Sequence, residues 1–273
     1  MRTISSERIT AKVKELCLKA NIELRPDVLR AIKGCVLNES WPVARKCLQA
    51  ILDNAAAAKR EQLAICQDTG FPAVFIGLGR GVCLGGDLAK AVNKGVNEGY
   101  REGSFRPSIV ADPLQRGKPG FTPAVCHIES VPGNRISITV LPKGFGCENK
   151  TRLKMFNPTA SVEEVKKFIV ETVKDAGPDA CPPYIVGVGI GGNADHAALM
   201  AKKALLKKIS TRPEKLEREL LTAINALRIG PMGMGGKVTA LGVSIIKYPT
   251  HIAGLPVAVS VSCHALRSAS GVL

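Results

Sequence analysis

Three cysteines stand at places in the sequence where a side chain could take part in chemistry. Cys66 follows an apolar run and comes directly before the polar turn Gln67–Gly70. Cys181 precedes Pro182-Pro183, and Cys263 ends a strand-like alternation. Thiolates bind transition metals and iron–sulfur clusters. With spacings of 115 and 82 residues, the three thiols meet only if the fold gathers three element ends, as at one edge of an α/β sheet. From spacing alone, buried core residues are the simpler interpretation.

The composition limits the class of protein. The chain has 273 residues, a formal net charge of +15, and only 7 Phe, 3 Tyr and 1 Trp. Its nine cysteines include no C-x-x-C pair, so they lack the zinc-knuckle and thioredoxin spacings. The first residues are charged and no run of about 18 residues is apolar throughout, so we expect neither a signal peptide nor a membrane span. We therefore expect a cytoplasmic protein in a reducing compartment, whose positive charge favours anionic partners.

Helical periodicity dominates the first sixty residues, and strands alternate with helices after them. The pattern predicts an N-terminal helical segment over about 5–60 and an α/β core over about 61–273. Within this core we expect a hairpin over 122–141, a helix behind the capping box at Ser161, and a lysine-bearing helix over 197–213. Since no linker interrupts the alternation, the prediction is a single mixed α/β catalytic domain, 1–273.

Two general binding signatures carry little weight here. Residues 187–192 formally satisfy G-x-G-x-x-G, the loop of dinucleotide-binding proteins. That site also needs a strand ending in an acidic residue about 20 residues later, and the chain has a lysine-bearing segment there, which is typical of a solvated helix face. The net charge leaves a basic nucleic-acid-binding protein with structural cysteines as an alternative of a different class, although few aromatic residues accompany the basic ones.

Several separated motifs occur together in one order. They are Ile65-Cys66-Gln67-Asp68-Thr69-Gly70, Lys143-Gly144-Phe145-Gly146-Cys147-Glu148-Asn149-Lys150-Thr151, Ala180-Cys181-Pro182-Pro183-Tyr184, Gly235-Gly236-Lys237, Pro249-Thr250-His251 and Val261-Ser262-Cys263. With these motifs the chain resembles the class I, iron–sulfur-dependent fumarases and L-tartrate dehydratases over about residues 5–273. Specifically, it is similar to their alpha subunit.

The resemblance implies a cofactor and a set of site residues. It makes Cys66, Cys181 and Cys263 the ligands of a [4Fe–4S] cluster with one iron open to substrate. Its implied substrate-binding positions are Gln67, Asp68, Arg106, Gly144, Gly146 and His251, of which Asp68 and His251 are also the catalytic candidates. A planar arginine fork such as that of Arg106 suits a carboxylate. Asp68 is the best candidate base within this chain.

Each of these assignments has a simpler alternative. Asp68 could cap the following turn, Arg106 could be a surface arginine, and His251 an ordinary loop residue. The chain departs from the family at Phe145 and Cys147, where small residues are common, and Cys147 could be mistaken for a ligand.

The resemblance also implies an activity and a partner. The first expectation is the alpha subunit of a fumarate hydratase of the tricarboxylic acid cycle, which reversibly hydrates fumarate to (S)-malate. The alternative is an L-tartrate dehydratase alpha subunit, which converts tartrate to oxaloacetate. Further substrate-binding residues are expected on a separate beta subunit in an α2β2 or larger assembly. An acidic beta subunit would account for much of the +15 charge.

Overall fold

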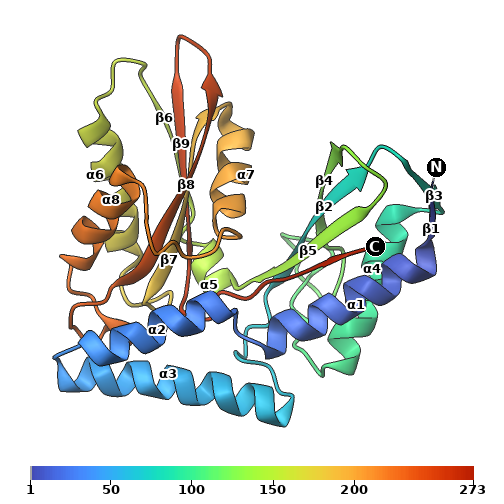
Figure 1. Ribbon diagram of the computed structural model, residues 1–273, viewed down its shortest axis with the longest axis horizontal. Coiled ribbons are helices and arrows are strands. Elements are labelled where there is room, and N and C mark those ends of the chain that lie inside the picture. The colour runs from blue at the N-terminus through green and yellow to red at the C-terminus, as the bar shows by residue number, and fades with distance from the viewer. Residues whose placement is uncertain (1) are drawn as a thin grey trace. The chain divides into compact units, whose positions relative to one another are not determined.

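The computed structural model describes residues 2–273 and divides the chain into two compact units. The first comprises 2–25, Ala55–Gly144 and Arg267–Leu273, and the second comprises Pro26–Asn54 and Phe145–Leu266. Both contain helices and sheet, so the predicted mixed α/β class is confirmed (Figure 1). That residues 1–273 act as one catalytic domain stays a prediction. Within 2–273, the helices are all too short or too polar to cross a membrane.

The predicted N-terminal helical segment is confirmed as three consecutive helices, α1 (Ser6–Ile22), α2 (Pro26–Asn38) and α3 (Pro42–Glu61). Ser5 caps α1 by accepting a hydrogen bond from the Arg8 backbone N–H. A short strand, β1 (Arg2–Ser5), precedes α1 and pairs in parallel with β3 (Val82–Gly85).

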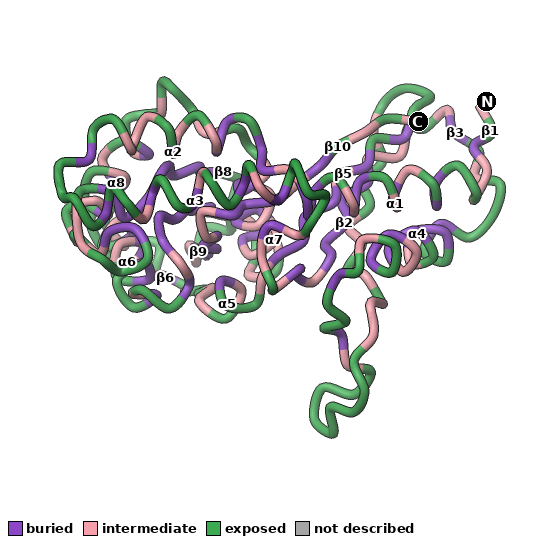
Figure 2. The backbone as a smooth tube through the Cα atoms, turned by 90° about the horizontal axis from the view of Figure 1, so that it is seen from below, coloured by how far each residue is buried: buried purple, intermediate pink, exposed green. Residues whose placement is uncertain are grey.

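The first unit is built on a four-stranded sheet in the order β10-β5-β2-β4. Its strands are β2 (Phe71–Gly79), β4 (Val125–Val131), β5 (Ile136–Lys143) and β10 (Ala269–Val272). Helices α1 and α4 (Leu88–Glu102) pack closely on each other, because Gly95 leaves no side chain between them. A Cβ at Gly95 would lie 2.5 Å from the Thr10 carbonyl oxygen. The buried residues of both helices and the inner strands share one core (Figure 2).

The predicted hairpin over 122–141 is wrong in its pairing. Strands β4 and β5 do not pair with each other, because β2 lies between them, parallel to β4 and antiparallel to β5. The physical reason is the apolar character of β2, whose residues 72–76 are all buried, as a central strand requires. The end of β2 and the residue after it bond across to the end of β4 and to the connection before β5. The Gly79 N–H donates to the Arg135 carbonyl, and the Arg80 N–H donates to the Val131 carbonyl.

The second unit holds a second four-stranded sheet, in the order β6-β9-β7-β8. Its strands are β6 (Arg152–Phe156), β7 (Tyr184–Gly192), β8 (Ala240–Thr250) and β9 (Leu255–Ser262). Helices α6 (Val162–Ala176) and α8 (Lys215–Asn225) cover one face and α7 (Ala194–Ala204) covers the other (Figure 1). The short helices α5 (Phe145–Glu148) and η1 (Pro231–Gly233) lie in connections. The capping box at Ser161 is present as predicted.

In this unit the structure corrects the predicted lysine-bearing helix and supports the argument against a dinucleotide site. The lysine-bearing helix predicted over 197–213 ends at Ala204, and its lysines are not simply a solvated face. Lys202 pairs with Glu148, and Lys207 donates to the Ile245 carbonyl at 2.8 Å. Strand β7 is parallel to β8 but antiparallel to β9, which supports the sequence argument against a dinucleotide-binding fold.

Candidate active site

In the first unit, the turn that carries Gln67 and Asp68 is held from several sides. The Tyr100 hydroxyl donates to the carbonyls of Thr69 and Gly70 at 2.9 and 3.3 Å. Tyr100 is 1% exposed, and this burial raises the pKa of its phenol well above the ordinary value, so the hydroxyl remains a donor. Gly70 has a φ of 77° and packs so tightly on the end of β5 that a Cβ would lie 2.7 Å from a backbone carbon of Pro142. These contacts restrain the backbone of the turn.

Asp68 has two different oxygens in this turn. Its Oδ1 accepts a hydrogen bond from the Gly70 N–H at 2.9 Å, which is the local turn role that the simpler alternative expected. Its Oδ2 faces Gly144, where a Cβ would lie 3.2 Å away. Gly144 thus leaves space beside the carboxylate, so the structure brings these two predicted site residues together.

Arg106 is anchored to the same turn through its backbone. The Thr69 hydroxyl accepts from the Arg106 N–H at 3.1 Å and lies 3.3 Å from the Arg106 carbonyl, to which it can donate. The preceding Phe105 is buried and packs edge-on against Tyr100, with 5.4 Å between ring centroids. The Arg106 side chain itself is exposed. A fixed backbone and an exposed guanidinium leave the fork available to an anion.

Arg267 is a buried cation that the sequence analysis missed. It is 3% exposed, and its Nη2 donates to the Asp68 carbonyl at 2.7 Å while Nη1 donates to Asn21 Oδ1 at 3.3 Å. Asn21 in turn donates from Nδ2 to the Cys17 carbonyl, and its own carbonyl accepts from the Ile65 N–H. Arg267 therefore connects the Asp68 turn to α1. The available signal was one charged residue in an otherwise small and apolar stretch after Cys263.

In the second unit, Cys181 and Cys263 lie at the same end of the sheet. Cys181 precedes β7 and Cys263 follows β9, and these strands pair with Ile185 opposite Ser262. The Cys181 carbonyl lies 3.4 Å from the His264 backbone N–H and 3.1 Å from its Nδ1. Cys181 has a φ of 57°, a conformation that L residues rarely adopt. Two of the three predicted ligands are therefore neighbours, and His264, which the sequence analysis gave no role, helps to join their segments.

Cys66 belongs to the first unit, so its meeting with the other two cysteines stays a prediction. Its Sγ lies 3.4 Å from Gln67 Oε1. Inside either unit, residues 2–273 contain no group of three His, Cys, Asp or Glu side chains placed to hold a metal ion.

The donor chemistry fits the expected cluster. Cys66, Cys181 and Cys263 are all partly exposed and lie outside helices and strands. By contrast, Cys17 lies fully buried in α1, and this burial raises the pKa of its thiol to about 12, which keeps it protonated.

Within the second unit, His251 lies at the opposite end of β9 from Cys263. It lies in the exposed connection between β8 and β9, where its Nδ1 accepts from the Ala253 N–H at 3.1 Å. Cys263 follows the far end of β9, whose eight residues span about 26 Å. Gly146 lies in α5, and a Cβ there would meet nothing within 4 Å. The substrate roles of both residues stay predictions.

The loop of the Gly235-Gly236-Lys237 motif is held by a buried acid that the sequence analysis did not single out. Glu39 is 4% exposed and accepts from the backbone N–H groups of Lys237 at 2.7 Å and Trp41 at 2.9 Å. A Cβ at Gly236 would lie 2.8 Å from Glu39 Oε2, and its φ of 99° also favours glycine. This loop is therefore held by the connection between α2 and α3.

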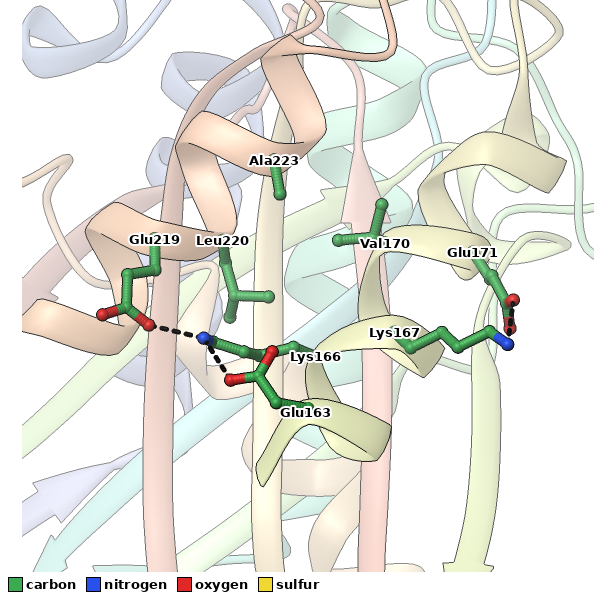
Figure 3. A pocket seen from close by; sticks show the side chains of 8 residues that line it. All are labelled: Glu163, Lys166, Lys167, Val170, Glu171, Glu219, Leu220 and Ala223. Atoms are coloured by element: carbon green, nitrogen blue, oxygen red, sulfur yellow. Dashed lines mark hydrogen bonds and ion pairs between the residues drawn. The ribbon is translucent and has the colours of Figure 1, made fainter. Parts of the chain in front are cut away.

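A surface pocket lies between α6 and α8 (Figure 3). Lys166 crosses it and pairs with Glu163 at 2.8 Å and Glu219 at 2.6 Å. Pairing raises the pKa of Lys166 and lowers that of Glu219. None of the sequence-predicted site residues lines this pocket, so we do not place the active site there.

Comparison with known proteins identifies the family. The family model described as fumarate hydratase (Fumerase) matches residues 10–272. The putative L(+)-tartrate dehydratase subunit alpha of Methanocaldococcus jannaschii is 39% identical over 275 residues, covering 96% of each chain. The L(+)-tartrate dehydratase subunits alpha of Escherichia coli strains UTI89 and K12 are 30% and 29% identical over 269 residues, covering 95% of this chain and 89% of each relative. The chain therefore belongs to the Fumerase family of iron–sulfur hydro-lyases, as a homologue of the alpha subunits of L-tartrate dehydratases.

Proposed function

We propose that the chain is the alpha subunit of an L-tartrate dehydratase that converts tartrate to oxaloacetate. The observation that carries this choice is the 39% identity, over 96% of both chains, to a relative named as such a subunit. It favours tartrate over fumarate, which the sequence analysis placed first. Fumarate hydration is the second candidate, because the matching family model bears that name. The comparisons lend no support to the nucleic-acid-binding alternative.

The proposed cofactor is a [4Fe–4S] cluster held by Cys66, Cys181 and Cys263. When bound with one iron open, it supplies a Lewis acid that eases departure of a hydroxyl group. The fit rests on three partly exposed thiols outside regular elements, two of which adjoin at one end of a sheet. Cys147, by contrast, is buried at 6% exposure.

The remaining proposed roles belong to side chains around the fixed turn. Arg106 binds one substrate carboxylate through its exposed fork, and the Gln67 amide donates to a substrate oxygen. Asp68 accepts the proton from the carbon that keeps its hydroxyl, while hydroxide leaves the neighbouring carbon. The resulting enol rearranges to the keto acid. Gly144 leaves room for substrate beside Asp68 Oδ2. We also propose that Gly146 and His251 contact the substrate, a role that rests on the family motifs and not on the geometry of the second unit.

We further propose a separate beta subunit, in an α2β2 or larger complex located in the cytoplasm. The relatives are named as alpha subunits, which supports a partner chain. The net charge of +15 suits an acidic partner.

The test is an anaerobic assay of this chain together with its co-purified partner. We expect kcat/KM for L(+)-tartrate to exceed that for (S)-malate by at least about tenfold, the discrimination that one well-recognised hydroxyl readily gives. A preference for malate would replace tartrate with the second candidate, and activity on neither acid would refute the proposed function. Arg106→Lys should lower kcat/KM, whereas Arg80→Lys, at an exposed arginine in a turn of the same unit, is the matched control.

A further inference from the structure

Cys147 contacts both backbone segments that carry the neighbouring predicted ligands. Its Sγ accepts a hydrogen bond from the Cys263 N–H at 3.1 Å. The same Sγ lies 3.4 Å from the Ala180 carbonyl oxygen, to which the thiol donates. Ala180 is bonded directly to Cys181. One sulfur therefore connects the end of β9 with the residue before Cys181.

The surroundings of Cys147 hold this sulfur in place. Cys147 is 6% exposed and belongs to the core of the second unit, together with Ala180 and Tyr184. Lys150, just beyond α5, forms an ion pair with Asp179 at 3.0 Å. The α5 segment thus contacts residues 179–180 through two side chains, one buried and one at the surface.

We propose that Cys147 is a positioning residue which holds the segments of Cys181 and Cys263 together, and that it is not itself a cluster ligand. The ligand part of this inference rests on the proposed function. Its geometric part rests only on the two contacts of the sulfur. Because a hydroxyl group can also accept and donate one hydrogen bond, serine can replace this cysteine in that role. Alanine cannot, and takes that partner from a partly buried N–H and a buried carbonyl.

The first experiment measures amide hydrogen exchange in the metal-free full chain. We compare the wild type with Cys147→Ser, Cys147→Ala and Cys47→Ala, the last removing a partly buried thiol from α3 in the second unit. The Cys263 amide should exchange about tenfold faster in Cys147→Ala, while Cys147→Ser and Cys47→Ala stay within about threefold of the wild type. Unchanged exchange in Cys147→Ala, or equal acceleration of every slow amide in the chain, would overturn the positioning role.

The second experiment loads the same four proteins anaerobically with iron and sulfide. Cys147→Ser should keep the iron content and the electron paramagnetic resonance spectrum of the reduced wild type. Cys147→Ala should show the same spectrum but lose iron to a chelator about tenfold faster. An altered spectrum or lost iron in Cys147→Ser would make Cys147 a ligand and overturn the proposal. If the wild type itself takes up no iron, the proposed function fails, and hydrogen exchange still decides the geometric role.

Discussion

Arg267 offers the sharpest test of how the Asp68 turn is held. Its guanidinium is 3% exposed and donates to the Asp68 carbonyl and to Asn21 Oδ1. Arg267→Met removes both donors while keeping a long apolar side chain. One buried and one part-buried acceptor then lose this donor, each at a cost of about 1–3 kcal/mol. Part of this cost is offset, because the wild type buries a charged group whose Nε has no hydrogen-bond partner, and the substitution removes that group. We expect a net loss of about 2–4 kcal/mol in the free energy of unfolding.

Arg267→Lys distinguishes the contribution of the positive charge from that of the planar guanidinium group. The ammonium group keeps the positive charge but cannot reproduce the planar geometry that reaches both acceptors. We expect a loss of about 1–3 kcal/mol, between the wild type and Arg267→Met. Urea unfolding of the metal-free chain, followed by circular dichroism, measures all three proteins. If Arg267→Met proves as stable as the wild type, or more stable, the cost of burying the charge exceeds the value of its hydrogen bonds and our reasoning is wrong.

Arg267 should also matter for turnover, because it fixes the backbone of Asp68. In the complex with the partner subunit, Arg267→Lys should lower kcat more than it raises KM, by about 10-fold or more in kcat. A change in KM alone would show that the residue supports substrate binding and not the placement of the proposed base.

Three further predictions concern other residues. Gly144→Ala places a Cβ 3.2 Å from Asp68 Oδ2, so turnover by the complex should fall about 10- to 100-fold while the free energy of unfolding changes by less than about 1 kcal/mol; full activity would contradict the close approach. Burial raises the pKa of the Cys17 thiol to about 12 in the folded protein, compared with about 8.5 in the unfolded chain. The stability that the buried thiol contributes is therefore complete below about pH 8.5 and declines as the pH rises towards 12. Between pH 8 and pH 10 the free energy of unfolding of the wild type should therefore fall by an additional amount of about 1–2 kcal/mol. Cys17→Ala should lack this additional fall, whereas Cys83→Ala, which removes an exposed thiol, should keep it. Equal pH dependence in all three proteins would refute the prediction. Glu39→Gln replaces one of two carboxylate oxygens that each accept a backbone hydrogen bond, and should cost about 1–3 kcal/mol in urea unfolding, a loss that is absent if the loop is held by other contacts.

The sequence predicted most helices because their signals are local. The capping box at Ser161 and the periodicity of the first sixty residues depend on neighbours a few positions away. The order of strands in a sheet has no such local signal, because it depends on which strand is most apolar on both faces. For that reason β2 lies between β4 and β5, and the predicted hairpin was wrong.

The site shows the same division between local motif and distant support. The motifs identified Asp68 and Gly144, which the fold places side by side. Arg267 lies 199 residues from Asp68 in the sequence and 246 from Asn21, so no spacing rule could connect them. Cys147 was singled out as a doubtful ligand, but its two contacts depend on the pairing of β7 with β9.

The central claim is that Cys66, Cys181 and Cys263 together hold an iron–sulfur cluster in this hydro-lyase alpha subunit. Its most direct test is the iron content and reduced-state spectrum of the anaerobically reconstituted chain, compared with Cys66→Ser, Cys181→Ser and Cys263→Ser. The account predicts about four irons for each wild-type chain and a lost or altered cluster in every one of the three variants. A wild type without iron, or any one of these variants that keeps the wild-type content and spectrum, would contradict it.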